Sequence, residues 1–207
     1  MMLRILVHAG GIIPMLWIIW ETAIHQSKFN PIQWATLTTG RLALIFLLLT
    51  LACTPIFILT GFSEVNRRRK ALGLYSFMYA AVHFSIFIAW DYGFAWSLIW
   101  QEFIQKRYLI AGVGAGVVLL LLAATSFKWW MKKLGKNWKR LHRLVYMAGV
   151  LVILHYAWIA KGDILTLQGD VMLPFFSGVL LLVLLALRIK WLRKRVVTYR
   201  QSLAVSK

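Results

Sequence analysis

The residues best suited to carry out chemistry are two histidines in one apolar stretch. His142 and His155 lie thirteen positions apart within residues 138–158, WKRLHRLVYMAGVLVILHYAW. If this stretch is helical, the rise of 1.5 Å per residue separates their Cα atoms by ~20 Å. A membrane's hydrocarbon layer is ~30 Å thick, so one imidazole would lie near each face. Because ionisable side chains inside a span mark a functional site by default and imidazole is a common metal ligand, this stretch is the candidate centre of the molecule.

The composition is that of an integral membrane protein. Of the 207 residues, 61% are hydrophobic, and only six acidic residues accompany 24 Lys and Arg. Soluble domains are about 45–50% apolar. The basic residues lie at the ends of apolar runs, as membrane topology requires, so the net charge does not indicate nucleic-acid binding. A single cysteine, Cys53, excludes an intrachain disulfide and CxxC chemistry, so redox work would need a bound cofactor.

Six apolar segments are long enough to span a membrane. They lie at roughly 4–24, 40–60, 71–91, 107–127, 141–160 and 171–190. Glu21, Thr22 and His25 follow the first segment in place of a cleavage site, so we expect an uncleaved span. The connections are short. The sequence therefore predicts an all-α, six-helix membrane bundle that forms one domain over residues 1–207.

The charges predict the orientation of this bundle. All but five of the 24 basic residues fall on one side of the six segments, and the positive-inside rule makes that side cytoplasmic, with both termini. The exceptions are Lys28, Arg41, Lys106, Arg107 and Lys161. On the basic side, residues 128–140 (KWWMKKLGKNWKR) mix tryptophans with lysines and predict an interfacial helix with aromatic anchors. A docking surface for an acidic cytosolic partner is a compatible second interpretation.

His83 and His155 have matching depths. His83 lies ~18 Å from the cytoplasmic end of its segment, and His155 ~21 Å from the same end of a span that runs in the same direction. A six-coordinate haem iron needs two axial imidazoles that face each other across the porphyrin. We therefore expect a haem b between them in the outer half of the membrane. Ser76 and Ala148, each seven residues before one of these histidines, are expected to leave room for the macrocycle.

His142 predicts a second haem near the inner face, whose other ligand stays open. Thirteen or fourteen residues before His83, at the matching depth, are Lys70 and Arg69, which cannot serve as haem ligands. His8 enters from the same side and is the best candidate. A five-coordinate haem or a non-histidine ligand is an alternative. Thirteen residues leave the two histidines of 138–158 ~140° apart around an ideal helix, so they would not share a face unless that span were distorted.

Two further features lie on the spans. Arg41, at the outer start of the second segment, has the depth of the outer haem, and its guanidinium could pair with a propionate carboxylate. An interfacial arginine without that role is an equally compatible interpretation. Gly112 and Gly116, within GVGAG, have the spacing of a close helix-packing motif.

Several segments resemble a known family. They are HAGGIIPMLW at 8–17, TGR at 39–41, TP at 54–55, LGL at 72–74 before His83, and LGKNWKRLHRLVYMAGVLVILHYAW at 134–158. These segments resemble the ferric reductase-like transmembrane domain of ferric reductases and NADPH oxidases. The finer resemblance is to the MsrQ (YedZ) family, the haem-binding membrane subunits of the bacterial MsrPQ methionine sulfoxide reductase system.

The resemblance implies haem ligation by His83, His142 and His155. It also implies a bacterial inner-membrane location and a periplasmic molybdenum-cofactor partner, MsrP, which reduces methionine sulfoxide in damaged proteins. The third segment has one histidine where the wider superfamily has two. The chain ends soon after its last span without a flavin and nicotinamide domain, so the electron donor would be the quinone pool or a cytosolic flavin reductase. FMN is implied by the resemblance alone, since we find no phosphate-cradling loop.

Three classes of function are thus open. The leading one is a transmembrane electron-transfer subunit with b-type haem. The second is a stand-alone membrane haem oxidoreductase that acts on ferric iron, quinone or oxygen. The third is a non-redox transporter or membrane chaperone whose histidines are polar packing residues.

Overall fold

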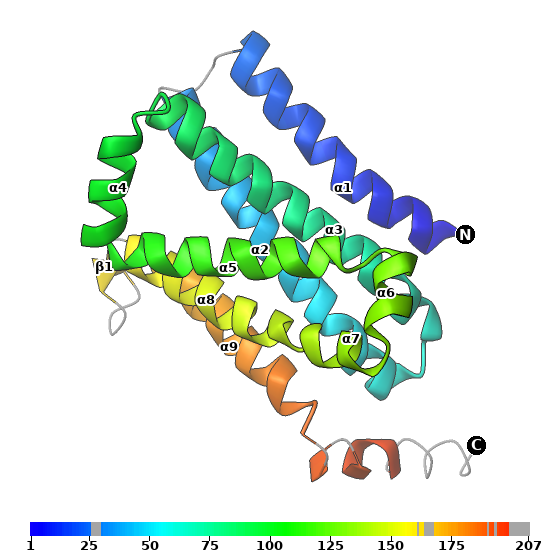
Figure 1. Cartoon of the computed structure of the whole chain (residues 1–207). Helices are drawn as coiled ribbons and strands as arrows, with labels where there is room; N and C mark the ends of the chain where they lie inside the picture. Colours follow the sequence, from blue (N-terminus) through cyan, green and yellow to red (C-terminus); the bar gives the residue numbers. More distant parts are fainter. Residues whose placement is uncertain (26–29, 161, 164–167, 190, 193, 199–207) are drawn as a thin grey trace.

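A computed structural model describes the chain except for residues 26–29, 161, 164–167, 190, 193 and 199–207. The described part is almost entirely helical, which confirms the all-α prediction (Figure 1). The helices are α1 (Met2–Trp20), α2 (Pro31–Thr60), α3 (Ser63–Ile86), α4 (Trp96–Gln105), α5 (Arg107–Ala124), α6 (Lys128–Leu134), α7 (Lys136–Leu141), α8 (Leu144–Ile159) and α9 (Met172–Ala186). Two π-helical turns, η1 (Glu21–His25) and η2 (Phe87–Asp91), continue α1 and α3, and β1 (Gly162–Asp163) pairs antiparallel with β2 (Gln168–Gly169).

Among the described residues, five helical stretches are long and apolar enough to cross a membrane, so the chain is a multi-pass membrane protein. They are Met2–Ile24, Pro31–Thr60, Ser63–Asp91, Arg107–Ala124 and Lys136–Ile159. The sixth expected span corresponds to α9, which has 15 residues. A helix of that length covers ~22 Å, less than the ~30 Å of a hydrocarbon layer. The sixth crossing therefore stays a prediction.

The central helix is α2, which carries more buried side chains than any other described helix. It starts at Pro31, nine residues before the predicted start at 40. The reason is a cap: the Asn30 side chain accepts a hydrogen bond from the Gln33 amide, and proline suits the first helical position. Gly61, with φ of 76°, ends the helix in the left-handed conformation that glycine adopts without strain.

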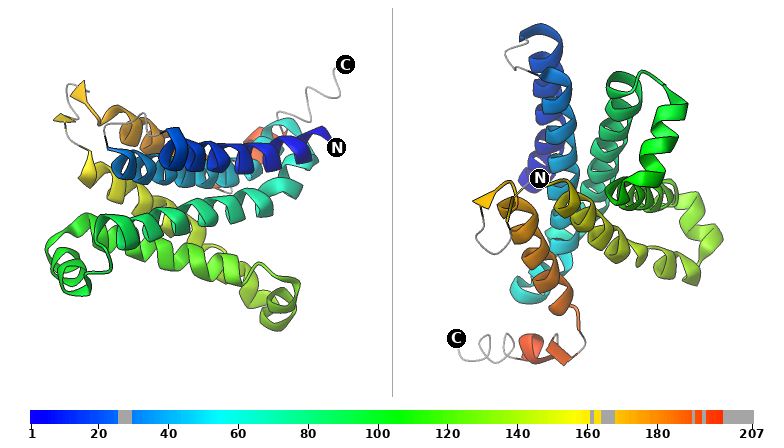
Figure 2. Two further views of the ribbon diagram at one scale, coloured as in Figure 1. Left: turned by 90° about the horizontal axis from the view of Figure 1, so that it is seen from above. Right: turned by 90° about the vertical axis from the view of Figure 1, so that its left-hand side faces the viewer.

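Two groups of helices pack on α2. On one side α1 and α3 lie along it, and on the other α5, α8 and α9 surround a second cluster (Figures 1 and 2). Polar side chains join the first group: Tyr79 on α3 donates to the Gly11 carbonyl of α1 at 2.8 Å, and Ser76 donates to the Ala43 carbonyl of α2 at 2.9 Å. Such bonds and close packing hold membrane helices together, because lipid offers no hydrophobic driving force between them.

A proline inside α2 is compensated by an arginine from the far end of the chain. Pro55 has no N–H, so the Leu51 carbonyl four residues earlier lacks its helical donor. Arg188, just beyond α9, donates to that carbonyl at 2.5 Å and to the Tyr146 hydroxyl of α8 at 2.6 Å. One guanidinium thus connects three helices.

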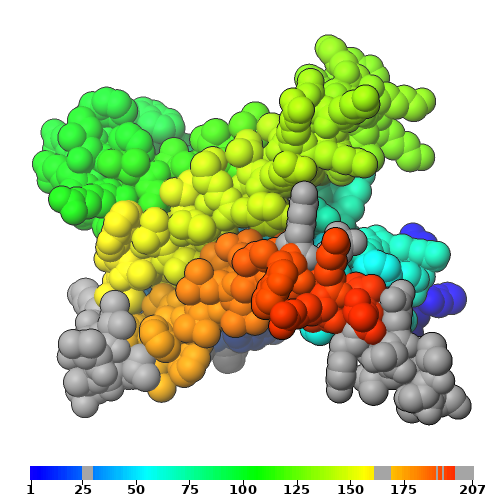
Figure 3. All heavy atoms as spheres, turned by 90° about the horizontal axis from the view of Figure 1, so that it is seen from below, coloured from blue at the N-terminus to red at the C-terminus, as the bar shows by residue number. Residues whose placement is uncertain are grey.

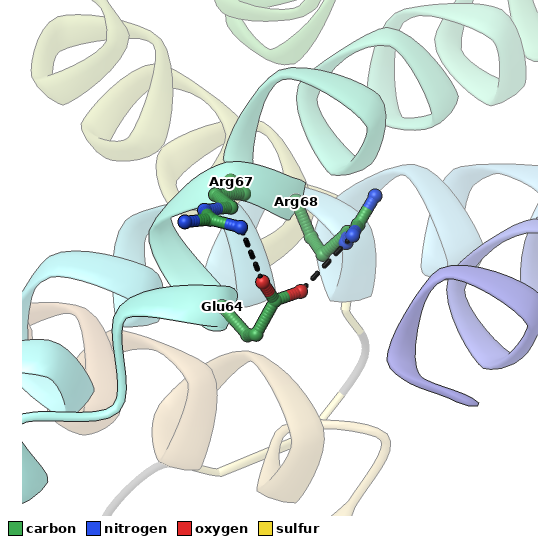
Figure 4. A network of polar contacts seen from close by, with 3 residues as sticks. All are labelled: Glu64, Arg67 and Arg68. Carbon is green, nitrogen blue, oxygen red and sulfur yellow. Dashed lines mark hydrogen bonds and ion pairs between the residues drawn. The ribbon is translucent and has the colours of Figure 1, made fainter. Parts of the chain in front are cut away.

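The basic segments gather at one end of the molecule. Figure 1 shows the start of α1, the α2–α3 turn, α6 and α7 at this end, and α4 with β1 at the other. Seen from below, α8 and α9 lie side by side, with α6 and α7 projecting at one corner and α4 at another (Figure 3). At the basic end, the Glu64 carboxylate lies between Arg67 and Arg68, at 2.8 and 3.0 Å (Figure 4).

Residues 128–140 form α6 and most of α7, joined at Gly135, whose φ is +49°. The Lys133 ammonium lies 4.7 Å from the Trp129 ring centre and 5.3 Å from that of Trp130, which accords with a helical segment of aromatic anchors and lysines. At the opposite end, Lys106 pairs with Glu102 between α4 and α5, and this carboxylate raises the pKa of the Lys106 ammonium.

Candidate functional site

His83 and His155 lie next to each other near the end of the bundle that carries α4. His83 is three residues before the end of α3, and His155 four before the end of α8. Their ring centres are 6.1 Å apart, and their ring planes cross at 87°. The structure therefore brings together the two histidines that depth alone had paired.

Main-chain carbonyls fix the protonation of both rings. His83 Nδ1 lies 2.8 Å from the Thr36 carbonyl of α2, and His155 Nδ1 lies 2.7 Å from the Tyr108 carbonyl of α5. A carbonyl oxygen only accepts, so each Nδ1 carries the hydrogen and donates it. In a neutral imidazole this leaves Nε2 with a lone pair. Histidines that bind metals show the same arrangement, with the second ring N–H given to a carbonyl or carboxylate.

The separation of the rings suits one metal ion between them. Metal–imidazole bonds are ~2 Å long, so two imidazoles on opposite sides of one ion have ring centres ~6 Å apart. The observed 6.1 Å agrees with that value. The ring-centre separation therefore fits two imidazoles that ligate one metal ion, as in a bis-histidine haem, and each side chain already has the tautomer that ligation requires.

Arg41 lies beside this pair. Its Nε donates to the Tyr156 hydroxyl at 3.3 Å, which links α2 to α8 one residue after His155. The guanidinium is exposed and retains its other N–H groups for a carboxylate ligand. Its position is compatible with the predicted propionate partner.

His142 lies elsewhere, at the junction of α7 and α8. Its Nδ1 is 3.2 Å from the Trp138 carbonyl, and its ring packs against the Trp138 ring with centres 4.0 Å apart. Trp138 in turn donates to the Thr125 carbonyl at the end of α5. His142 Nε2 is buried and has no hydrogen-bond partner among the residues that the structure describes. An orphaned buried acceptor is rare in proteins and fits a ligand for a bound group.

The structure does not join His8 to His142. His8, on α1, lies 2.9 Å from the Tyr75 hydroxyl of α3, and its ring contacts the Tyr75 ring. Within the described residues, no hydrogen bond or ring contact links the two histidines. The His8–His142 ligand pair stays a prediction. The side chain of His25 lies outside the described part.

Ser76 and Ala148 do not provide the space that was expected of them. Both have 0% exposure, and the Ser76 hydroxyl bonds to α2. Ser76 lies against α2, and Ala148 lies in the apolar cluster formed by α2, α5, α8 and α9, so neighbouring helices occupy the room that the sequence had assigned to a macrocycle.

Sequence reasoning missed the acceptors of the two Nδ1–H groups. The carbonyls of Thr36 and Tyr108 belong to the main chain, and no side-chain pattern reveals them. The Arg41–Tyr156 contact was also missed, although Arg41 was itself a candidate and Tyr156 follows His155.

Comparison with known proteins identifies sequence relatives of this chain. A sequence model of the ferric reductase like transmembrane component matches residues 39–153, more than half of the chain. A protein of Xanthomonas axonopodis pv. citri, named protein-methionine-sulfoxide reductase heme-binding subunit MsrQ, is 37% identical over 96% of this chain and 91% of its own. A Bordetella pertussis protein of the same name is 36% identical over 92% of this chain and 90% of its own.

No solved structure matches the chain significantly. The family match includes Arg41, His83 and His142, and the similarity to the two relatives extends over nearly the full sequence. The chain therefore belongs to the MsrQ family, within the proteins that share the ferric reductase-like transmembrane domain.

Proposed function

We propose that this protein is a membrane electron-transfer subunit that binds b-type haem, with His83 and His155 as the axial ligands of one haem. One observation carries the proposal: two imidazoles with centres 6.1 Å apart, each with Nδ1 bonded to a main-chain carbonyl. The names of the relatives, which describe heme-binding subunits, support it.

The bound haem would supply one-electron redox chemistry. The chain's own residues do the rest. The carbonyls of Thr36 and Tyr108 hold the Nδ1 protons and so keep both Nε2 atoms available. Arg41 offers a positive charge to a propionate at the same end of the bundle.

A second haem is proposed at His142. The buried, unpartnered Nε2 of this residue supports it. His8 remains the candidate for the opposite ligand, with five-coordination or a non-histidine ligand as alternatives. FMN stays a prediction from the resemblance.

The charge distribution gives the proposed direction of transfer. The basic end of the bundle would face the cytoplasm of a bacterial cell, which sets the His83–His155 site near the periplasmic face of the inner membrane. Electrons would enter from the quinone pool or a cytosolic flavin reductase and leave to MsrP, the periplasmic enzyme that repairs oxidised methionine. Membership in the family named for this reductase supports that partner.

The test of ligation is spectroscopic. Purified full-length protein from haem-replete cells should show a Soret band and a sharp reduced α band. His83→Ala and His155→Ala should each remove the low-spin signal of the outer haem, because a single imidazole cannot fill both axial positions. Ser85→Ala, two residues from His83 and exposed, is the control and should keep it. A colourless folded wild type, or a low-spin signal retained in either histidine variant, would refute the proposal.

A second experiment separates a subunit from a stand-alone oxidoreductase. The reduced protein is mixed with MsrP or with ferric chelates, and haem oxidation is followed by stopped flow. Oxidation that is fast with MsrP and slow with the chelates supports the subunit. The reverse order would favour direct ferric reduction.

A further inference from the structure

Each of the paired histidines lies against a glycine of the helix that supplies its carbonyl. A Cβ at position 40 would be 3.1 Å from His83 Nδ1, and a Cβ at position 112 would be 2.6 Å from His155 Nδ1. Real Cβ atoms essentially never approach another heavy atom within 3.0 Å, so position 112 tolerates no side chain while the ring stays in place. At position 40 the ring would have to yield by a few tenths of an ångström.

The two arrangements repeat one another along the chain. His83 lies 47 positions after Thr36, and His155 lies 47 positions after Tyr108. In both helices the glycine comes four residues after the carbonyl residue, so it lies one turn further along the same face. In the helix pair α2–α3 and in the pair α5–α8, one imidazole is thus held in the same way. The two imidazoles lie next to each other.

We propose that Gly40 and Gly112 are positioning residues that set the angle between the two axial imidazoles and the strength of their Nδ1–H bonds. This inference rests on the proposed haem ligation. A glycine lets the Nδ1–Cε1 edge of the ring come close to the helix, where the carbonyl one turn earlier can accept the Nδ1 proton. The two rings rest on two different helices, α2 and α5, and their planes cross at 87°.

The angle and the bonds have measurable consequences. Crossed imidazole planes leave the iron orbitals of a ferric low-spin haem nearly degenerate, which gives a strongly anisotropic electron paramagnetic resonance (EPR) spectrum with a large highest g value. An Nδ1–H bond to a carbonyl raises the basicity of the ligand and so favours ferric iron. Displacing a ring should therefore lower the highest g value. Weakening its Nδ1–H bond should raise the midpoint potential.

The helix α5 offers matched controls. A Cβ at position 116 would meet nothing within 4 Å, and one at position 114 would be in ordinary contact at 3.6 Å with Leu151. Gly112 and Gly116 were expected to form a close helix-packing motif; Gly112 does lie against a neighbouring helix, at His155 of α8, whereas Gly116 faces open space, so the expectation is wrong for Gly116. Gly114→Ala and Gly116→Ala change helix propensity as Gly112→Ala does, but they leave His155 untouched.

The experiment compares full-length, haem-loaded variants in detergent. Continuous-wave EPR of the oxidised protein and a potentiometric titration are recorded for Gly112→Ala, Gly40→Ala, Gly114→Ala and Gly116→Ala. We expect the largest fall in g value and rise in potential, or loss of the outer haem, for Gly112→Ala. Gly40→Ala should show a smaller change in the same direction, and the two controls should match wild type.

Gly40→Ala keeps the test decisive if Gly112→Ala does not fold, because its contact is relieved by a small shift. Any other ranking of the changes in g value and potential overturns the inference. Examples are controls that change as much as Gly112→Ala, or Gly40→Ala and Gly112→Ala that are both indistinguishable from wild type. Absence of haem from the wild type would instead refute the proposed function, so the two failures are distinguishable.

Discussion

At the level of single side chains, the location of one proton decides what His83 and His155 can do. A histidine in an apolar span can satisfy both ring nitrogens by packing, and then it has nothing left for a ligand. Here a carbonyl takes Nδ1–H in each case, and Nε2 makes no hydrogen bond in the described part of the chain. The same tautomer holds at His142, whose Nε2 is buried.

Arg41 gives a prediction at this scale. Arg41→Gln should lower the midpoint potential of the outer haem, because an added electron loses the attraction of a nearby cation. A unit charge ~10 Å away at an effective dielectric constant of ~20 contributes ~1.7 kcal/mol, or roughly 70 mV for one electron. Potentiometric titration measures the shift. Tyr156→Phe, which frees the guanidinium from its hydroxyl partner, should give a smaller change.

Arg67→Gln serves as the control for this measurement, because Arg67 lies at the opposite end of the bundle beside Glu64. A potential that falls equally in the control, or that stays unchanged in Arg41→Gln, would rule out Arg41 as a neighbour of the haem.

Depth along the spans was enough to predict the meeting of His83 and His155, since both helices run the same way and share an end. The sequence could not locate the other members of the site. The Nδ1 acceptors are main-chain atoms, and the role of Gly112 depends on which face of α5 meets α8. For Ser76, the choice between room for a ligand and close contact with α2 depends on packing that periodicity does not determine.

At the level of elements, the contact between Arg188 and α2 makes a proline tolerable inside a span. Arg188→Met should destabilise the protein by ~1–3 kcal/mol, the cost of leaving the buried Leu51 carbonyl unpaired. Pro55→Ala restores the missing helical N–H, so the same arginine change should cost about 1 kcal/mol less in that background. Unfolding of the wild type, the two single variants and the double variant in mixed micelles gives the coupling energy between Pro55 and Arg188. Strictly additive effects would show that Pro55 and Arg188 are independent.

Element boundaries show where pattern reasoning stops. The apolar run placed the start of the second span at residue 40, whereas α2 begins at the Asn30–Pro31 cap. The extra turns carry Thr36, so the carbonyl that His83 needs lies in a part of the helix that hydropathy did not indicate. The boundary between α6 and α7 has a visible local cause, because it falls at Gly135 within the basic segment.

At the level of the whole molecule, the gathering of basic segments at one end predicts the orientation in the membrane. The only cysteine is buried, so single introduced cysteines can be tested without removing it. Ser97→Cys on α4 should react with an impermeant maleimide in intact spheroplasts, and Lys132→Cys on α6 should react only after permeabilisation. Both wild-type side chains are exposed, so access depends on the side of the membrane. The opposite labelling pattern would invert the proposed direction of electron flow.

The attachment of both imidazoles to helix backbone has a consequence for the speed of transfer. A ligand that swings on a flexible side chain must move whenever the charge on its metal changes, and that movement adds to the activation barrier. Rings bonded to main-chain carbonyls and seated against glycines have little freedom to respond. Groups fixed in place before a reaction need no rearrangement during it. With the proposed haem between them, the two rings would thereby be suited to exchanging electrons quickly in either oxidation state.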